Sequence, residues 1–271
     1  MTIWSCATCA IEHPDTPEPP QVCEICADER QFIPAGGQRW TTRDTLAAQG
    51  FRIAVTALEP GLHAVEAVPE LGIGQRGLLV QTSHGNVLWE PPGFIDDAGI
   101  AAVRALGGVA AITASHPHLT GSSIQWSQAF GGVPVHVAAA DRQWIRRPDP
   151  VIHLWADRVE LLPGLAMHQC GGHFAGSSVL HWPAGVDGRG ALLTGDTIAI
   201  GADMHSVNAM RSYVNNIPLP RKAIQRILDV SAPLAFDRLY GAFRQIDAGA
   251  RQITVDSLHR YMAWLDGTPP E

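Results

Sequence analysis

The stretch 109–123 constrains the fold of this chain more than any other segment. It opens with the apolar, partly β-branched run 109–113, which predicts a short buried strand. The letters SHPH follow at 115–118, and GSS at 121–123 predicts a turn and an N-cap before a helix over 124–130. Two imidazoles one residue apart therefore lie on a tight strand-to-helix connection, where both rings can turn toward one metal ion.

A second signal is the clustering of four of the five cysteines near the N-terminus. They form two Cys-x-x-Cys pairs, Cys6 with Cys9 and Cys23 with Cys26, and each pair can place both sulfurs on one tetrahedral ion. The segment 11–21 between the pairs has four prolines and few apolar residues, so the metal has to supply the folding energy. The pattern predicts a structural four-cysteine zinc knuckle. A rubredoxin-like iron centre and disulfides are the two alternatives.

Charge and length bound the remaining possibilities. The chain has 271 residues, 46% of them hydrophobic, and a net charge of -7, which argues against nucleic acid as a partner. The sequence shows no long apolar run and no leader pattern, so we expect a cytoplasmic protein without a membrane partner. The letters PAGG at 34–37 predict a boundary between a knuckle domain, 1–37, and a main domain, 38–271.

The sequence of the main domain predicts many strands with helices at intervals. This order is typical of an α+β fold in which helices flank the sheets. A hairpin is predicted over 77–89, with its turn at SHGN. The expected strands are 51–55, 63–68, 78–82, 87–89, 109–113, 133–137, 159–162, 165–168, 178–182 and 191–194. The expected helices are 38–48, 95–106, 124–130, 141–145, 219–230 and 255–265.

Three strand ends carry groups that bind metals. They are His116 with His118, His173 after two glycines, and Asp196 after one glycine. Strand ends followed by flexible turns can converge on one edge of a sheet sandwich, where sites are usually assembled. Three neutral imidazoles and a carboxylate suit Zn, Fe or Mn and leave room for water.

With these motifs in place, the chain resembles the metallo-β-lactamase fold superfamily over about 39–267. The resemblance rests on the hairpin, on the strand and loop around SHPH, on GHFAGS at 172–177 and on LTGD at 193–196. It implies a four-layer αββα sandwich, here preceded by a small zinc-knuckle or rubredoxin-like segment. It also implies hydrolysis of β-lactams, thioesters, lactones or phosphodiesters at one or two metal ions.

The resemblance assigns the metal ligands residue by residue. It implies that His116, His118 and His173 hold the first metal and that Asp196 is the carboxylate that bridges to a second. The family loop usually continues as H-x-H-x-D-H, whereas Thr120 and Gly121 stand at the last two positions here. A Gly-His-Gly element near the C-terminus is replaced by LYGAF at 239–243, without histidine. We therefore expect a single Zn, Fe or Mn ion in this main site.

The knuckle, the SHPH loop and this tail together resemble a degenerate branch described simply as metal-dependent hydrolase-like. The resemblance implies a small-molecule ester, lactone, thioester or phosphoester substrate, with the metal activating water and Asp196 as the catalytic carboxylate. A non-catalytic, metal-stabilised binding or scaffold protein is the alternative. A third possible function is nucleic-acid processing, but the net negative charge of the chain argues against it. Substrate-binding residues and the oligomeric state do not follow from the sequence.

Several other side chains receive no functional role. We expect His13, Asp15 and Glu18 to be solvated loop residues and Cys170 to be a small buried hydrophobe.

Overall fold

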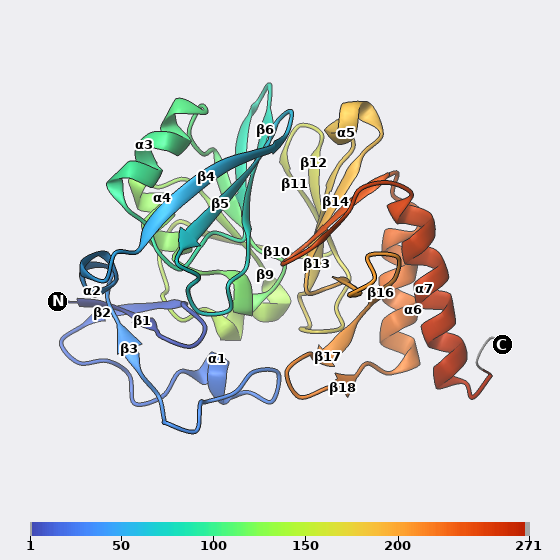
Figure 1. The fold of residues 1–271 in the computed structure, drawn as a ribbon, viewed down its shortest axis with the longest axis horizontal. Helices are drawn as coiled ribbons and strands as arrows, with labels where there is room; N and C mark the ends of the chain where they lie inside the picture. Colours follow the sequence, from blue (N-terminus) through green and yellow to red (C-terminus); the bar gives the residue numbers. More distant parts are fainter. Residues whose placement is uncertain (1, 269–271) are drawn as a thin grey trace. The chain divides into compact units, whose positions relative to one another are not determined.

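The structure is a computed structural model that describes residues 2–268, and it divides into two compact units (Figure 1). The first unit comprises Met1–Val137 and Arg142–Leu154, and the second comprises Ala138–Asp141 and Trp155–Glu271. Each unit has a sheet and a hydrophobic core of its own. Within the described residues, no helix combines the length and the apolar character that crossing a membrane requires.

The N-terminal part of the first unit is a small sheet around the cysteines. Strand β1 (Thr2–Cys6) lies between β2 (Glu12–Thr16) and β3 (Trp40–Thr41), and both pairings are antiparallel. The short helix α1 (Glu24–Ala27) carries the second cysteine pair. The helix expected from residue 38 begins only at α2 (Arg43–Ala48), because 40–41 pair with β1. Thr42 caps this helix, since its side chain accepts a hydrogen bond from the Thr45 amide.

The main sheet of the first unit has seven strands in the order β10-β9-β8-β7-β6-β5-β4. Strands β4 to β7 form an antiparallel meander, and β7, β8 and β9 run parallel. The predicted hairpin is confirmed as the β6–β7 pair, with Leu79 opposite Leu88. The bounds are β4 (Arg52–Glu59), β5 (Leu62–Val68), β6 (Gly77–Thr82), β7 (Gly85–Trp89), β8 (Ala111–Thr113), β9 (Val135–Ala138) and β10 (Ile152–Trp155).

Helices α3 (Asp97–Ala105) and α4 (Ser123–Ala129) provide the crossovers that parallel strands need. The Asp96 side chain caps α3 by accepting from the Gly99 amide at 2.6 Å, and its second oxygen accepts from the Ile53 amide of β4 at 3.0 Å. Sheet and helices enclose a core that includes Leu88, Ile112 and Trp126. This core fixes the end of β8, after which the SHPH loop begins.

The four-cysteine segment packs directly against the rest of the first unit. Arg30 lies 4.9 Å from the ring centre of Trp144, and Arg146 forms an ion pair with Glu24. A side chain at Gly93 would collide with the Ala10 carbonyl, so only glycine allows the two backbones to approach this closely. The segment is therefore held from several sides.

The second unit is built on a six-stranded sheet in the order β11-β12-β13-β14-β19-β20. Only β14 and β19 run parallel; the other pairs are antiparallel. Helices α6 (Arg221–Ser231) and α7 (Ala250–Leu265) lie side by side and bury Ile227 and Leu258 in a core with Leu192 of the sheet (Figure 1). The strands are β11 (Arg158–Leu162), β12 (Leu165–Gln169), β13 (Ser178–Trp182), β14 (Ala191–Gly195), β19 (Arg238–Gly241) and β20 (Gln245–Ile246).

Short elements complete the second unit. Two small hairpins follow β14, namely β15 (Ala199–Ile200) with β16 (Val207–Asn208) and β17 (Met210–Ser212) with β18 (Ile217–Pro218). One helical turn, α5 (Gly185–Gly188), joins β13 to β14. The expected helix over 141–145 is instead a 3-10 helix, Ala139–Trp144. The carboxylate of its Asp141 accepts from the Gly176 amide at 2.8 Å.

Candidate metal centres

The four cysteines of the N-terminal segment form one compact cluster. Their Sγ atoms all lie within 4.8 Å of one another, and the Cys6–Cys26 and Cys9–Cys23 sulfurs are 3.7 Å apart. A tetrahedral ion with metal–sulfur bonds of about 2.3 Å requires sulfur–sulfur distances of about 3.8 Å. All four cysteines are buried and none is in a disulfide, so the cluster fits a structural four-thiolate metal centre.

The pKa values of the clustered thiols shift in opposite directions, because burial raises the pKa of Cys9 and a hydrogen bond with Cys23 raises that of Cys26. Hydrogen bonds from the thiols of Cys26, Cys6 and Cys9 hold the pKa of Cys23 well below its usual range. The Cys6 sulfur also accepts from the Thr8 amide at 3.4 Å and from the Gln38 side chain at 3.2 Å. Such N–H groups stabilise negative charge on a sulfur that binds a metal.

The expectation of a solvated His13 is wrong. This side chain is only 4% exposed, and its ring packs edge-on against Trp40 at 4.6 Å between centroids. Strand β2 pairs with β1 and buries the adjacent residues Glu12 and His13 at its start, which the proline-rich sequence did not suggest. Asp15 and Glu18 are exposed, as expected.

The first unit places His116 and His118 at the end of β8. His118 lies on one 3-10 turn, Pro117–Leu119, that leads toward α4. Both imidazoles are 3% exposed, their centroids are 5.1 Å apart, and their ligand nitrogens lie within 4.8 Å of each other. Buried imidazoles that face each other this closely are typical of a metal site.

A chain of hydrogen bonds determines which ring nitrogen of His116 carries the proton. The Ser115 hydroxyl donates to the carboxylate of Glu90 and lies 2.8 Å from Nδ1 of His116. Because a hydroxyl has one proton and it goes to the carboxylate, the Ser115 oxygen accepts from Nδ1–H of His116. A neutral ring with its proton on Nδ1 has its lone pair on Nε2. The Nε2 atom is therefore the one prepared to bind a metal.

The sequence did not reveal Glu90 or Ser115 as parts of this site. Glu90 follows β7, is 1% exposed and has a φ of 52°, in the left-handed region that few side chains adopt. A single glutamate after a tryptophan carries no spacing signal. Its partner lies 25 residues away, and only the parallel pairing of β7 with β8 brings the two together.

The loop after His118 has no room for the family's next histidine. Gly121 has a φ of 48°, and a side chain there would collide with the carbonyl of Pro91. The Gly121 carbonyl instead accepts from the Glu12 amide at 3.2 Å. Residues at this position therefore connect the loop to the four-cysteine segment. The left-handed φ and the adjacent Pro91 carbonyl favour a glycine where the H-x-H-x-D-H pattern has its last histidine.

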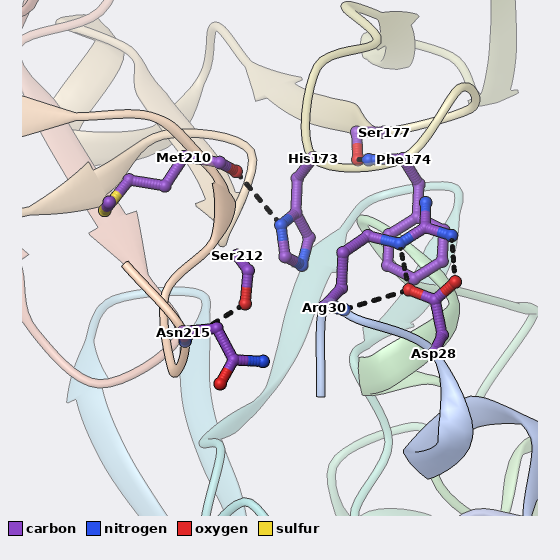
Figure 2. Close-up of polar contacts among 8 residues, drawn as sticks. All are labelled: Asp28, Arg30, His173, Phe174, Ser177, Met210, Ser212 and Asn215. Carbon is purple, nitrogen blue, oxygen red and sulfur yellow. Dashed lines mark hydrogen bonds and ion pairs between the residues drawn. The ribbon is translucent and has the colours of Figure 1, made fainter. Parts of the chain in front are cut away.

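The second unit holds His173 in a tight loop between β12 and β13. Its Nδ1 lies 3.1 Å from the Met210 carbonyl, which can only accept, so the ring carries its proton on Nδ1 and its lone pair on Nε2 (Figure 2). The Phe174 amide donates to the Ser177 hydroxyl at 2.8 Å and closes the loop. His173 is 1% exposed. It is fixed in the same tautomer as His116.

Asp196 follows β14 in the same unit and is linked to His173 through Tyr213. The Tyr213 hydroxyl donates to the Asp196 main-chain carbonyl at 2.9 Å, and its ring lies 5.5 Å from that of His173. Burial raises the pKa of Asp196 to about 7. A nearby cation would stabilise the carboxylate that burial disfavours, so the group suits a metal site.

The other departure from the family pattern, at 239–243, lies at the end of a strand and on the turn that follows it. Residues 239–243 end β19 and turn toward β20, and Phe243 is 55% exposed on that turn.

Cys170 is fully buried in the core of the second unit, and burial raises the pKa of its thiol to about 12. The expectation that Cys170 is a small buried hydrophobe is confirmed.

No family model matches the chain. Solved structures with the same fold are metallo-β-lactamases. DIM-1 has a TM-score of 0.56 at 12% identity, covering 77% of this chain and 97% of that one. The mono-zinc form of FIM-1 from Pseudomonas aeruginosa has a TM-score of 0.54 at 15% identity, covering 78% and 96%. A B3 enzyme with an active-site glutamic acid has a TM-score of 0.54 at 16% identity, covering 80% and 92%. These matches confirm the expected fold.

A sequence relative is far more similar. It is the uncharacterized protein YmaE of Bacillus subtilis (strain 168), which is 40% identical over 248 residues, 91% of this chain and 90% of the relative. The chain therefore belongs to the YmaE family and has the metallo-β-lactamase fold, with a four-cysteine cluster at its N-terminus.

Proposed function

We propose that this protein is a metal-dependent hydrolase whose main site binds one ion through His116, His118 and His173, with Asp196 as a further ligand. The observation that carries the proposal is the tautomer of two of these rings. His116 and His173 each give Nδ1–H to a fixed acceptor, which leaves Nε2 for a metal. The four-cysteine cluster holds a second, structural ion, with zinc as our assignment and iron as the alternative.

Different residues of the chain orient the ligands and accept the proton at the main site. When bound, a Zn, Fe or Mn ion supplies Lewis-acid chemistry that polarises a substrate oxygen and makes water easier to deprotonate. Ser115 and Met210 hold two imidazoles in orientation, and Tyr213 holds the Asp196 turn. Asp196 is the catalytic residue, and its carboxylate oxygen accepts the proton of the attacking water. A second ion is not part of the proposal, because Gly121 leaves no room for its histidine.

The proposed substrate is a small molecule with an ester, lactone, thioester or phosphoester bond. The fold supports a small-molecule substrate, since the solved structures that share it are named as metallo-β-lactamases. The net charge of -7 supports the absence of a nucleic-acid partner. A cytoplasmic location and the division into domains 1–37 and 38–271 belong to the same proposal.

The test is Asp196→Asn, assayed against lactone, thioester, ester and phosphodiester substrates. We expect the wild-type protein to hydrolyse one of these classes slowly. The variant should lose this turnover while it stays folded, because the amide keeps the volume but cannot accept the proton. Asp229→Asn, an exposed aspartate of α6, is the matched control and should keep the wild-type rate.

The alternative is a binding or scaffold protein in which the metal only cross-links the fold. The absence of the family's histidines at Gly121 and within 239–243 favours this reading. It predicts no turnover with any substrate class and a change in thermal stability alone for Asp196→Asn. That result, with metal bound to the wild-type protein, would refute the hydrolase.

A further inference from the structure

Helix α4 begins without a cap of its own. Sequence spacing predicts that a serine at 122 or 123 provides the cap, but the Ser122 side chain forms no capping hydrogen bond. The acceptor is instead Glu12 of β2. Its Oε1 accepts from the Ile124 amide at 2.5 Å and lies 3.4 Å from the Gln125 amide. A residue between the two cysteine pairs thus caps the helix that follows the SHPH loop.

The Glu12 carboxylate is held firmly in this position. It is 3% exposed, and its Oε2 lies 2.5 Å from the guanidinium of Arg147, whose side chain is 13% exposed. Its main-chain amide donates to Gly121 at 3.2 Å. One residue therefore binds the loop by its backbone and the helix by its side chain. A negative charge at a helix N-terminus, paired with the half-buried Arg147, adds electrostatic stabilisation to the cap.

The segment between His116 and α4 is short and continuously hydrogen-bonded. The Leu119 amide donates to the His116 carbonyl at 3.2 Å, and the Ser123 amide donates to the Thr120 carbonyl at 3.1 Å. Leu119 is fully buried. The turn that presents His118 is thus fixed at one end by β8 and at the other by α4. Releasing the α4 end would let the two imidazoles drift from a common point.

From these contacts we propose that Glu12 is a positioning residue for the His116–His118 pair. The inference rests on the proposed function, since it assumes that the pair binds an ion. Because Glu12 lies between the cysteine pairs, its place depends on the folding of that segment, which the structural ion supplies. The four-cysteine centre therefore does more than stabilise the N-terminus. It raises the affinity of the main site for its own ion.

The test uses the full-length protein titrated with Co²⁺ after removal of bound metal. A cobalt ion in the four-cysteine centre gives thiolate-to-cobalt charge-transfer absorption. A cobalt ion in the main site has no thiolate ligand, so its binding is followed by ligand-field absorption that increases without any increase in charge-transfer absorption. Glu12→Ala should keep the first signal and weaken binding of the second ion by about 5- to 30-fold, the equivalent of losing a helix cap worth ~1–2 kcal/mol. Glu12→Gln keeps an oxygen for the Ile124 amide and should restore much of the affinity.

Asp15→Ala is the matched control, because Asp15 is an exposed acidic residue on the same strand. It should bind both ions as the wild type does. If Glu12→Ala binds the second ion with wild-type affinity, the positioning role of Glu12 is overturned and the proposed function is not. Loss of both signals together in Glu12→Ala and Glu12→Gln would show that Glu12 only maintains folding, and would also overturn the positioning role. A wild-type protein that binds cobalt only at the cysteines would refute the proposed function, and this inference with it.

Discussion

At the scale of single residues, the proposed main site is organised by groups outside the proposed set of metal ligands. A neutral imidazole can carry its proton on either nitrogen, and the wrong choice removes the lone pair that the ion needs. Glu90 and Ser115 settle this choice for His116, and the Met210 carbonyl settles it for His173. Two unrelated acceptors thus impose the same tautomer on both rings. Such outer contacts commonly tune metal affinity as strongly as a change of ligand.

This arrangement predicts the effect of Ser115→Ala. The variant removes the acceptor for Nδ1–H of His116 and leaves Glu90 buried without its hydroxyl partner. We expect the affinity of the main site for its ion to fall by about 10- to 100-fold, measured by competition with a chromophoric chelator. Ser127→Ala is the control, since that buried hydroxyl donates to the Val133 carbonyl away from the histidines. Equal affinities in the two variants would contradict the assignment.

At the scale of elements, the sequence predicted what short-range patterns encode. The apolar run before SHPH, the 77–89 hairpin and the two C-terminal helices are confirmed, because alternation and helical periodicity are local properties. Strands β10, β19 and β20 were missed, since they are short and polar in part. The α4 cap was assigned to the nearest serine, whereas the true acceptor lies 112 residues away.

The candidate site shows the same division between local and distant information. Its histidines and cysteines could be found from spacing, because Cys-x-x-Cys and His-x-His place ligands on a single turn. Glu90 and Glu12 could not be found, because nothing in their neighbourhoods differs from an ordinary strand end. Their roles depend on strand pairing and on the packing of the four-cysteine segment.

Gly121 offers a test at this scale. Its φ of 48° and the adjacent Pro91 carbonyl leave no space for a side chain. Gly121→Ala should lower the free energy of unfolding by about 2–5 kcal/mol, combining left-handed strain with overpacking. Gly131→Ala is the matched control, with a φ of 87° and open space around it, and should cost only about 1–2 kcal/mol. Urea denaturation measures both. If both variants lose the same free energy of unfolding, the loop can rearrange to accommodate a side chain at position 121.

At the scale of the whole molecule, the five cysteines separate into two classes. Four form the N-terminal cluster, and Cys170 lies in the core of the second unit. We expect the first group to depend on a metal to stay buried, because its segment has little hydrophobic core. The second depends only on packing. Burial raises the pKa of Cys170 to about 12, so at pH 8 only about one thiol in 10,000 is ionised.

Thiol titration at pH 8 should therefore distinguish the two classes. We expect no reactive thiols in the metal-loaded protein, four after chelation, and the fifth only after denaturation. The Cys170→Ala variant, measured in the same way, should show the same four thiols and no fifth. Fewer than four after chelation would indicate disulfides in the N-terminal segment. A fifth thiol reacting before denaturation would show that the core of the second unit opens readily.

The central claim is that the chain holds two ions of different kinds, one on sulfur and one on histidine. The most direct measurement is metal content per chain by elemental analysis, for the wild-type protein and for His116→Ala. The account predicts two ions in the wild type and one in the variant, with the four N-terminal cysteines still protected from thiol reagents. One ion in the wild type, or two ions retained in His116→Ala, would contradict it.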